Sequence, residues 1–219
     1  MDFKRKIIQD LNRIDTTRRS QVFSDWLEWS AIMIQNAVYQ KKDDLWKRRE
    51  DRHRIISRFY GSDCSLFSEM LAFLVLALED QISDVLGEVF MDSGLASKSQ
   101  YFTPFNICLF MAASQLDGVV ENKVADVIEP SCGSGGMILA YARILYERGI
   151  NYQQCLKVTA QDSDWLSVYM CYIQLSLIGV RAAVIQGDSL IPSKTGLLSP
   201  DQIFYTPMCL IENPLKTQK

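Results

Sequence analysis

Three carboxylates each stand at the end of a short apolar run of the sequence: Glu129, Asp162 and Asp188. Glu129 also opens a glycine-rich stretch, E-P-S-C-G-S-G-G, which ends at Gly136 and leads into a helical pattern. If the runs are parallel strands, their carboxyl ends meet at one edge of a sheet, where such folds bind ligands. A glycine-rich turn that feeds a helix also presents free backbone N–H groups to a ligand. The sequence therefore predicts one ligand pocket, built from this turn and the three carboxylates.

The glycines and Glu129 narrow the choice of ligand. A dinucleotide site has the pattern G-x-G-x-x-G with an acidic residue about 20 positions later, but here the third glycine is missing and Asp162 comes too late. A carboxylate just before the turn would repel a pyrophosphate and attract an ammonium group. S-adenosylmethionine (SAM) has that ammonium group and no phosphate. We therefore expect a SAM site, in which Asp162 accepts hydrogen bonds from the ribose hydroxyls and Asp188 accepts one from the adenine amine.

Alternating patterns predict the elements that hold this pocket. Strands alternating with helices imply a parallel sheet with right-handed crossovers, and hence an α/β fold. We expect this Rossmann-like core to span residues 99–219. The β-branched runs lie at 124–128, 156–161 and 182–186, and the helical patterns between them at 137–148 and 164–178.

Helical spacing of apolar residues dominates the chain before the core. Residues 3–59 predict two or three helices, in which 41–58 is a helix end or a connecting loop because charged residues prevail there. Residues 65–91 predict a third helical block. We therefore expect residues 1–98 to form an all-helical N-terminal domain.

Three short polar stretches are candidates for helix breaks or N-caps. Two lie in the N-terminal part, at 15–17 and at Ser24-Asp25. The third is Thr103-Pro104, where threonine is a good N-cap and proline lacks the N–H that would be unpaired in the first turn. We expect a helix from Pro104 to about Leu116.

Composition and charge limit the class of protein. Of the 219 residues, 48% are hydrophobic and 22% are charged, which is typical of a soluble globular protein. Neither a membrane-spanning run nor a secretory signal is visible, so we expect a cytoplasmic protein without a membrane partner. The one histidine, His53, lies in a charged run, which argues against a Ser-His-Asp site or a histidine metal centre. Residues 1–58 carry 14 basic and 9 acidic side chains, an excess that suits either a solvated helix with mixed charges or a DNA-binding face.

Four motifs, in this order, resemble those of the N6-adenine DNA methyltransferase family, in particular the modification subunits of type I restriction-modification systems. Together they cover roughly residues 84 to 190. They are D-V-L-G-E-V-F at 84–90, Y-F-T-P at 101–104, E-P-S-C-G-S-G-G at 129–136 and G-D-S-L at 187–190.

The resemblance implies roles for the matching positions. Glu129 would bind the methionine ammonium group of SAM, and Thr103 would lie near the methionine carboxylate. Gly133 and Gly135 would let the backbone approach the cofactor. The full set of cofactor-binding positions that the resemblance implies is Tyr101, Thr103, Glu129, Pro130, Cys132, Gly133, Gly135, Asp162 and Asp188.

The family's catalytic motif, N-P-P-[YF], has one candidate here, N-P-L-K at 213–216. The resemblance implies that Asn213 and Pro214 are catalytic, while leucine and lysine replace the second proline and the aromatic ring. The sheet would be truncated at this point, which would leave the strand at 124–128 with an apolar edge. The helical N-terminal domain, the C-terminal tail or a second copy of the chain could cover that edge, and of these we expect a homodimer.

The residues and this resemblance together thus predict a SAM-dependent methyltransferase that acts on adenine N6 in DNA. The expected partners are DNA and a specificity subunit or another subunit. One alternative is a catalytically degenerate SAM-binding or DNA-binding module that regulates through a partner subunit. A second is a nicotinamide-dependent oxidoreductase, which Glu129 and the missing third glycine argue against.

Overall fold

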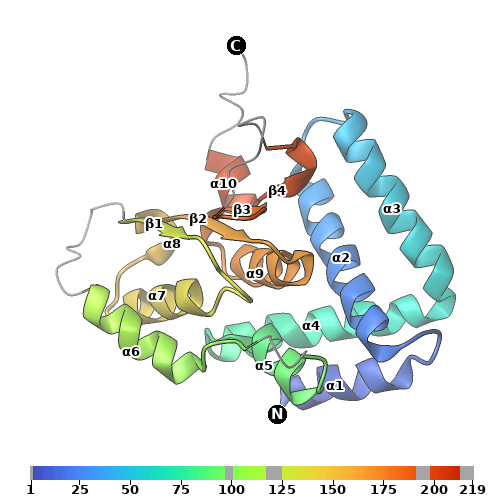
Figure 1. Cartoon of the computed structure of the whole chain (residues 1–219), viewed down its shortest axis with the longest axis horizontal. Coiled ribbons are helices and arrows are strands. Elements are labelled where there is room, and N and C mark those ends of the chain that lie inside the picture. Colours follow the sequence, from blue (N-terminus) through green and yellow to red (C-terminus); the bar gives the residue numbers. More distant parts are fainter. Residues whose placement is uncertain (1, 97–100, 117–124, 191–197, 213–219) are drawn as a thin grey trace.

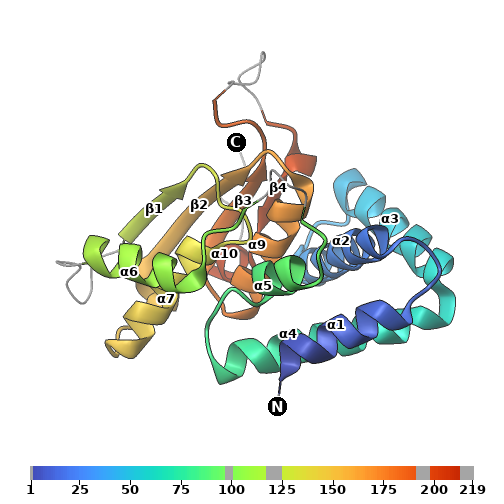
Figure 2. The same cartoon turned by 60° about the horizontal axis from the view of Figure 1, so that its bottom comes forward.

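A four-stranded sheet forms the centre of the core, with strand order β1-β2-β3-β4. The computed structural model describes residues 2–96, 101–116, 125–190 and 198–212. The first three strands are parallel, as predicted, and the last is antiparallel to its neighbour β3 (Figure 2). The strands are β1 (Ala125–Glu129), β2 (Leu156–Asp162), β3 (Arg181–Gln186) and β4 (Ile203–Tyr205).

The crossover helices lie on one face of the sheet. They are α7 (Gly136–Glu147), which follows β1 and packs against α6 (Phe105–Gln115), and α9 (Trp165–Leu177), which packs against β2 and β3. The short helix α8 (Tyr152–Cys155) precedes β2. Leu156, Val158 and Ala160 of β2 are buried, whereas Lys157 and Thr159 between them are exposed. One face of β2 is therefore core, and the other faces solvent within the described part of the chain.

β1 is an edge strand, as expected from the resemblance. Ile128 is 78% exposed, and the paired Asp126 and Lys157 form an ion pair on the same open face. An exposed isoleucine on a strand edge is a site for association. The homodimer predicted to cover this edge stays a prediction.

Within the described residues, the helices α1 to α5 form the part of the chain before α6 and the sheet (Figure 1). α1 packs along α4 and contacts α5, while α2 packs against both α3 and the core helix α9. The buried side chains form one continuous cluster from Ile7 of α1 to Phe204 of β4. Residues on both sides of position 98 contribute to this cluster. The division into two domains at residue 98 stays a prediction. The helices are α1 (Phe3–Arg13), α2 (Arg19–Val38), α3 (Asp44–Tyr60), α4 (Cys64–Asp80) and α5 (Val85–Asp92), with a 3₁₀ turn, η1 (Gly61–Asp63), between α3 and α4.

Local interactions overturn the prediction that residues 41–58 form a helix end or loop. Asp43 caps α3 by accepting a hydrogen bond from the Trp46 N–H at 3.1 Å. Ion pairs between residues three apart, such as Arg54–Asp51, support the exposed face. The charged residues that suggested a loop are the solvated side of a helix.

Two other predicted helix boundaries also differ. The block 65–91 is two helices, α4 and α5, separated by residues 81–84, because Asp84 caps α5 through the Gly87 N–H at 3.0 Å. The break predicted at 15–17 is present between α1 and α2, but Ser24-Asp25 lies inside α2 and the prediction of a break there was wrong. Asp25 is instead a buried acceptor for the Tyr60 hydroxyl at 2.8 Å.

The stretch Asp44–Asp80 is long and apolar enough to cross a membrane by length and composition. It is not one straight helix, because η1 separates α3 from α4 and the chain changes direction there (Figure 1). α4 packs against α1 along its length (Figure 2). One face of α4, which carries Phe67, Met70 and Leu74, is therefore buried in the protein.

The basic residues of α3 hold β4 against the N-terminal helices. Arg49 is buried, lies 4.5 Å from the centre of the Phe204 ring and donates a hydrogen bond to the Ile203 carbonyl at 3.0 Å. Arg48 forms a bidentate pair with Asp201 in η2 (Pro200–Gln202). After β4 the chain continues into α10 (Pro207–Glu212).

We predict that Arg49→Ala lowers the free energy of unfolding by about 2 kcal/mol, since it leaves a buried carbonyl without its charged donor and removes the stacking on Phe204. Urea unfolding followed by circular dichroism measures this. Arg54→Ala is the matched control on the same helix, because an exposed pair contributes about 0.5 kcal/mol or less. Equal losses in the two variants would contradict the structural role of Arg49.

Candidate functional site

A cavity of about 490 Å³ lies at the carboxyl ends of β1 and β2. It falls between the loop that follows β1, the loop that follows β2 and the segment before α6. Its lining is rich in carboxylates and hydroxyls. The lining residues are Asp84, Tyr101, Phe102, Thr103, Cys108, Glu129, Ser131, Cys132, Gly133, Ser134, Gly136, Met137, Asp162, Ser163, Asp164 and Ser167.

The loop after β1 has a backbone that requires glycine at two places. Gly133 has φ 53° and Gly135 has φ 97°, in the region that side chains disfavour. A Cβ on Gly133 would lie 3.0 Å from the Phe102 ring, and one on Gly135 would lie 3.2 Å from the Cys171 sulfur. The loop therefore combines positive φ angles with close packing, and its backbone can approach a ligand.

The parallel pairing of β1 and β2 brings two carboxylates to one cavity. Asp162 accepts hydrogen bonds from the Gly133 N–H at 2.9 Å and the Asp164 N–H at 3.0 Å, one on each oxygen. Glu129 accepts one from the Ser131 N–H at 3.2 Å. Each carboxylate oxygen has a further lone pair, so both groups can also accept hydrogen bonds from a cationic or hydroxyl-bearing ligand.

Six of the predicted cofactor-binding residues line this cavity: Tyr101, Thr103, Glu129, Cys132, Gly133 and Asp162. Pro130 and Gly135 belong to the same loop but do not line the cavity. Their predicted roles stay predictions, as do those of the residues that line it.

Asp188, the third predicted carboxylate, does not line the cavity. It follows β3, is exposed and accepts a hydrogen bond from the Leu190 N–H at 2.9 Å. The catalytic candidates Asn213 and Pro214 lie outside the described residues.

The helix after Thr103 begins one residue later than predicted. Pro104 is the N-cap, with an extended ψ of 136°, and α6 begins at Phe105. The Ile107 N–H and the Cys108 N–H both donate to the Pro104 carbonyl, and Thr103 makes no side-chain cap. The prediction that Thr103 caps this helix was therefore wrong, although Thr103 does reach the cavity.

Residues 79–207 match the N-6 DNA methylase family, and this range contains every residue that lines the cavity. The chain belongs to the N-6 DNA methylase family. Its structure is similar to that of a Listeria monocytogenes protein assigned to the class I SAM-dependent methyltransferases. The TM-score is 0.51, with 11% sequence identity over 96% of this chain and 68% of that chain. A comparison with curated proteins found no match.

SAM is the methyl donor of this N-6 DNA methylase fold, and the cavity suits it. Its volume lies in the usual range of about 300–1,000 Å³ for small-molecule sites. Carboxylates suit the ammonium group and the ribose hydroxyls, and the glycine loop offers its backbone. When bound, SAM supplies an electrophilic methyl group, and the residues that line the cavity would bind and orient it.

Sequence reasoning missed a buried polar network beneath the glycine loop of this family member. Asp84 is only 4% exposed, and burial raises the pKa of its carboxyl above the ordinary value. Ser134 donates its hydroxyl to Asp84 at 2.5 Å, and the Gln174 amide donates to Asp84 at 3.0 Å. Asp84 could have been suspected from its place before a helix with glycine three positions later, but Gln174 carries no comparable signal.

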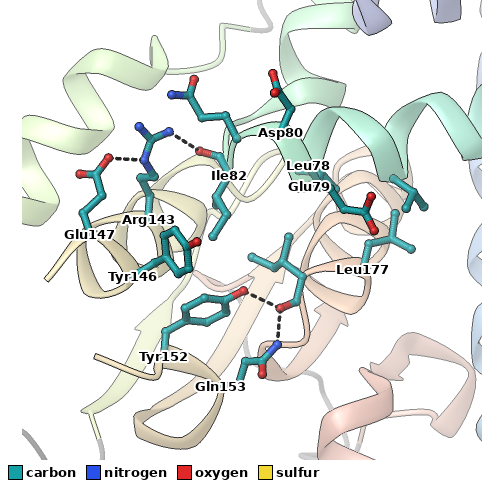
Figure 3. A pocket seen from close by; sticks show the side chains of 13 residues that line it. Leu78, Glu79, Asp80, Ile82, Arg143, Tyr146, Glu147, Tyr152, Gln153 and Leu177 are labelled. Atoms are coloured by element: carbon teal, nitrogen blue, oxygen red, sulfur yellow. Dashed lines mark hydrogen bonds and ion pairs between the residues drawn. The ribbon is translucent and has the colours of Figure 1, made fainter. Parts of the chain in front are cut away.

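A second cavity, of about 410 Å³, lies against the ends of α4, α7 and α9 (Figure 3). Four of its polar side chains, Arg143, Glu147, Tyr152 and Gln153, already have hydrogen-bond or ion-pair partners. Arg143 pairs with Glu147 and donates to the Ile82 carbonyl, and Tyr152 and Gln153 both donate to the Ile178 carbonyl (Figure 3). These pairings join the helices, so we assign this cavity no ligand.

We predict that Asp162→Ala weakens SAM binding at least tenfold, because it removes the acceptor for the ribose hydroxyls and releases the Gly133 N–H. Isothermal titration with SAM and with S-adenosylhomocysteine measures the change. Asp126→Ala is the control, since Asp126 lies on the open face of β1 and pairs only with Lys157 among the described residues. Unchanged affinity in Asp162→Ala would show that the cofactor does not contact this strand end.

Proposed function

We propose that this chain transfers the methyl group of SAM to the N6 amine of adenine in DNA. The observation that carries this proposal is the match of residues 79–207 to the N-6 DNA methylase family. The carboxylate-lined cavity within that range supports it, because it offers hydrogen-bond acceptors for a cofactor with an ammonium group and ribose hydroxyls.

The proposed reaction forms a bond from the adenine N6 to the methyl carbon and breaks the bond from that carbon to sulfur. The amine loses one proton to solvent, and S-adenosylhomocysteine leaves. Adenine must leave the base stack to reach the methyl group. We propose that the adenine amine donates hydrogen bonds to the side-chain oxygen of Asn213 and to the Pro214 carbonyl. These two bonds would increase the electron density on N6.

Incubation of the chain with tritium-labelled SAM and adenine-containing duplex DNA tests the proposal. We expect label in N6-methyladenine, and a loss of at least a hundredfold in Asn213→Ala with unchanged SAM affinity. Asn151→Ala is the control, since Asn151 caps α8, away from the cavity. Binding of SAM without any transfer of label would contradict the proposed activity.

The second candidate function is a SAM-binding module that regulates a partner without transferring methyl groups. The course of the chain after β3 favours it. β4 runs antiparallel to β3, so Thr206 reaches the amino-terminal end of β3, where its hydroxyl donates to the Val180 carbonyl at 2.7 Å. The described chain thus enters α10 from the end of the sheet opposite the cavity. SAM binding together with no label transfer is the result that this candidate expects.

We further propose that DNA contacts the exposed basic side of α3. The arginines Arg48, Arg49 and Arg52 are already engaged with Asp201, Ile203 and Glu28. Neutralising them would disturb the packing rather than only the surface charge. The other basic side chains of this helix, Lys47, Arg54 and Arg58, are exposed, and Lys47 and Arg54 pair with Asp44 and Asp51 of the same helix.

We predict that replacing Lys47, Arg54 and Arg58 with glutamine weakens binding to random-sequence duplex DNA. Each lost phosphate contact should reduce the slope of log affinity against log salt by roughly 0.9. Fluorescence anisotropy at several salt concentrations measures both quantities. Lys157→Gln, on the open face of the sheet, is the control. Equal salt dependence in the triple variant and the wild type would place DNA elsewhere.

A further inference from the structure

Asp84 is a buried carboxylate that comes from the N-terminal helices and reaches the glycine loop of the core. It lies before α5, and its hydrogen-bond partners in the described structure are the Gly87 N–H, the Ser134 hydroxyl and the Gln174 amide. None of these partners is a cation. Hydrogen bonds from neutral donors therefore hold a carboxyl group that burial penalises.

Gln174 completes the network from α9. Its side-chain N–H₂ group donates to Asp84 at 3.0 Å and to the Ser134 carbonyl at 2.9 Å. Its side-chain oxygen accepts from the Leu86 N–H at 3.0 Å. One fully buried glutamine thus binds the start of α5 and the glycine loop at the same time.

Gly87 has no side chain, and the network occupies the space that a side chain at this position would need. A Cβ at this position would lie 2.2 Å from a carboxylate oxygen of Asp84 and 2.6 Å from the Ser134 hydroxyl. Real Cβ atoms do not approach so closely. The pattern of aspartate followed three residues later by glycine therefore accommodates Ser134 as well as the helix cap.

Ser134 lies between the two glycines with positive φ, Gly133 and Gly135. Asp84 holds its side chain and Gln174 holds its carbonyl, which restricts the side chain and the peptide unit between Ser134 and Gly135. Glycines lose more conformational entropy on ordering than other residues. A loop ordered before binding spares the ligand that cost.

We propose that Asp84 is a positioning residue of the SAM site, which acts through Ser134 to hold the glycine loop in the conformation that binds the cofactor. The inference rests on SAM binding in the proposed function, but not on which substrate is methylated. It makes SAM affinity depend on the docking of α5, an element of the N-terminal helices, against the core.

Ser134→Ala is the informative variant, because it removes one hydroxyl and leaves the Asp84 cap of α5 in place. We expect the dissociation constant for SAM to rise at least tenfold, measured by isothermal titration. Ser176→Ala is the matched control, since Ser176 is a buried serine of α9 outside the network. We expect it to change the dissociation constant less than twofold.

Hydrogen exchange tests the same inference without any ligand. The amides of Cys132, Gly133 and Gly135 are hydrogen-bonded in the loop. We expect them to exchange at least tenfold faster in Ser134→Ala than in the wild type. The amides of β2 should exchange at the wild-type rate in both serine variants.

Substitution of Asp84 separates positioning from a purely structural role. Asp84→Asn keeps an acceptor for the Gly87 N–H and a polar group facing Ser134, so we expect SAM affinity closer to wild type than in Asp84→Ala. If the role were structural only, Asp84→Ala would lower the melting temperature while the folded fraction bound SAM normally.

The outcomes are distinguishable. Unchanged SAM affinity and unchanged loop exchange in Ser134→Ala would overturn the inference. If the wild type binds neither SAM nor S-adenosylhomocysteine, the proposed function fails, and loop exchange alone then decides whether Asp84 positions the loop.

Discussion

The loop that follows β1 is fixed from two sides, and the cavity depends on both attachments. On the side of the sheet, the Cys132 N–H donates to the Gln161 carbonyl and the Gly133 N–H donates to Asp162, each at 2.9 Å. On the other side, Ser134 is held by Asp84 and Gln174. Without these hydrogen bonds, a loop with two positive-φ glycines would sample many conformations.

The N-terminal helices therefore do more than cover the core. Asp84, the N-cap of α5, accepts a hydrogen bond from the Ser134 hydroxyl of the glycine loop, α2 packs against α9, and Arg49 of α3 donates to β4. The charge asymmetry of the sequence partly reflects this packing. Arg48 of the basic segment pairs with Asp201 of the acidic remainder, so some of the opposite charge is internal complementarity.

The arrangement of the sheet bears on what the chain can do with SAM. Two neighbouring strand ends supply Glu129 and Asp162, which is sufficient to form a polar cavity. Among the described strands, β1 is at one edge of the sheet and β4 is at the other, beyond β3. The cavity lies at the carboxyl ends of β1 and β2, whereas β4 ends beside the amino-terminal end of β3.

The sequence by itself determined the parallel core and the principal carboxylates. The β-branched runs, the glycine turn and the acids that follow the strands are local signals, since each follows from the conformational preferences of a few adjacent residues. They predicted β1 to β3, α7, α9 and the cavity position of Glu129, Gly133 and Asp162. The same local reasoning failed at α3, where charge was mistaken for a loop.

Only the tertiary structure decided which polar residues meet across long distances in the chain. Asp84, Ser134 and Gln174 come from three separate segments, and no spacing in the sequence relates them. The contact between Arg49 and the Phe204 ring is likewise not predictable from the sequence. The physical reason is that a buried polar group is stable only with partners, and the packing of whole helices against the sheet selects those partners.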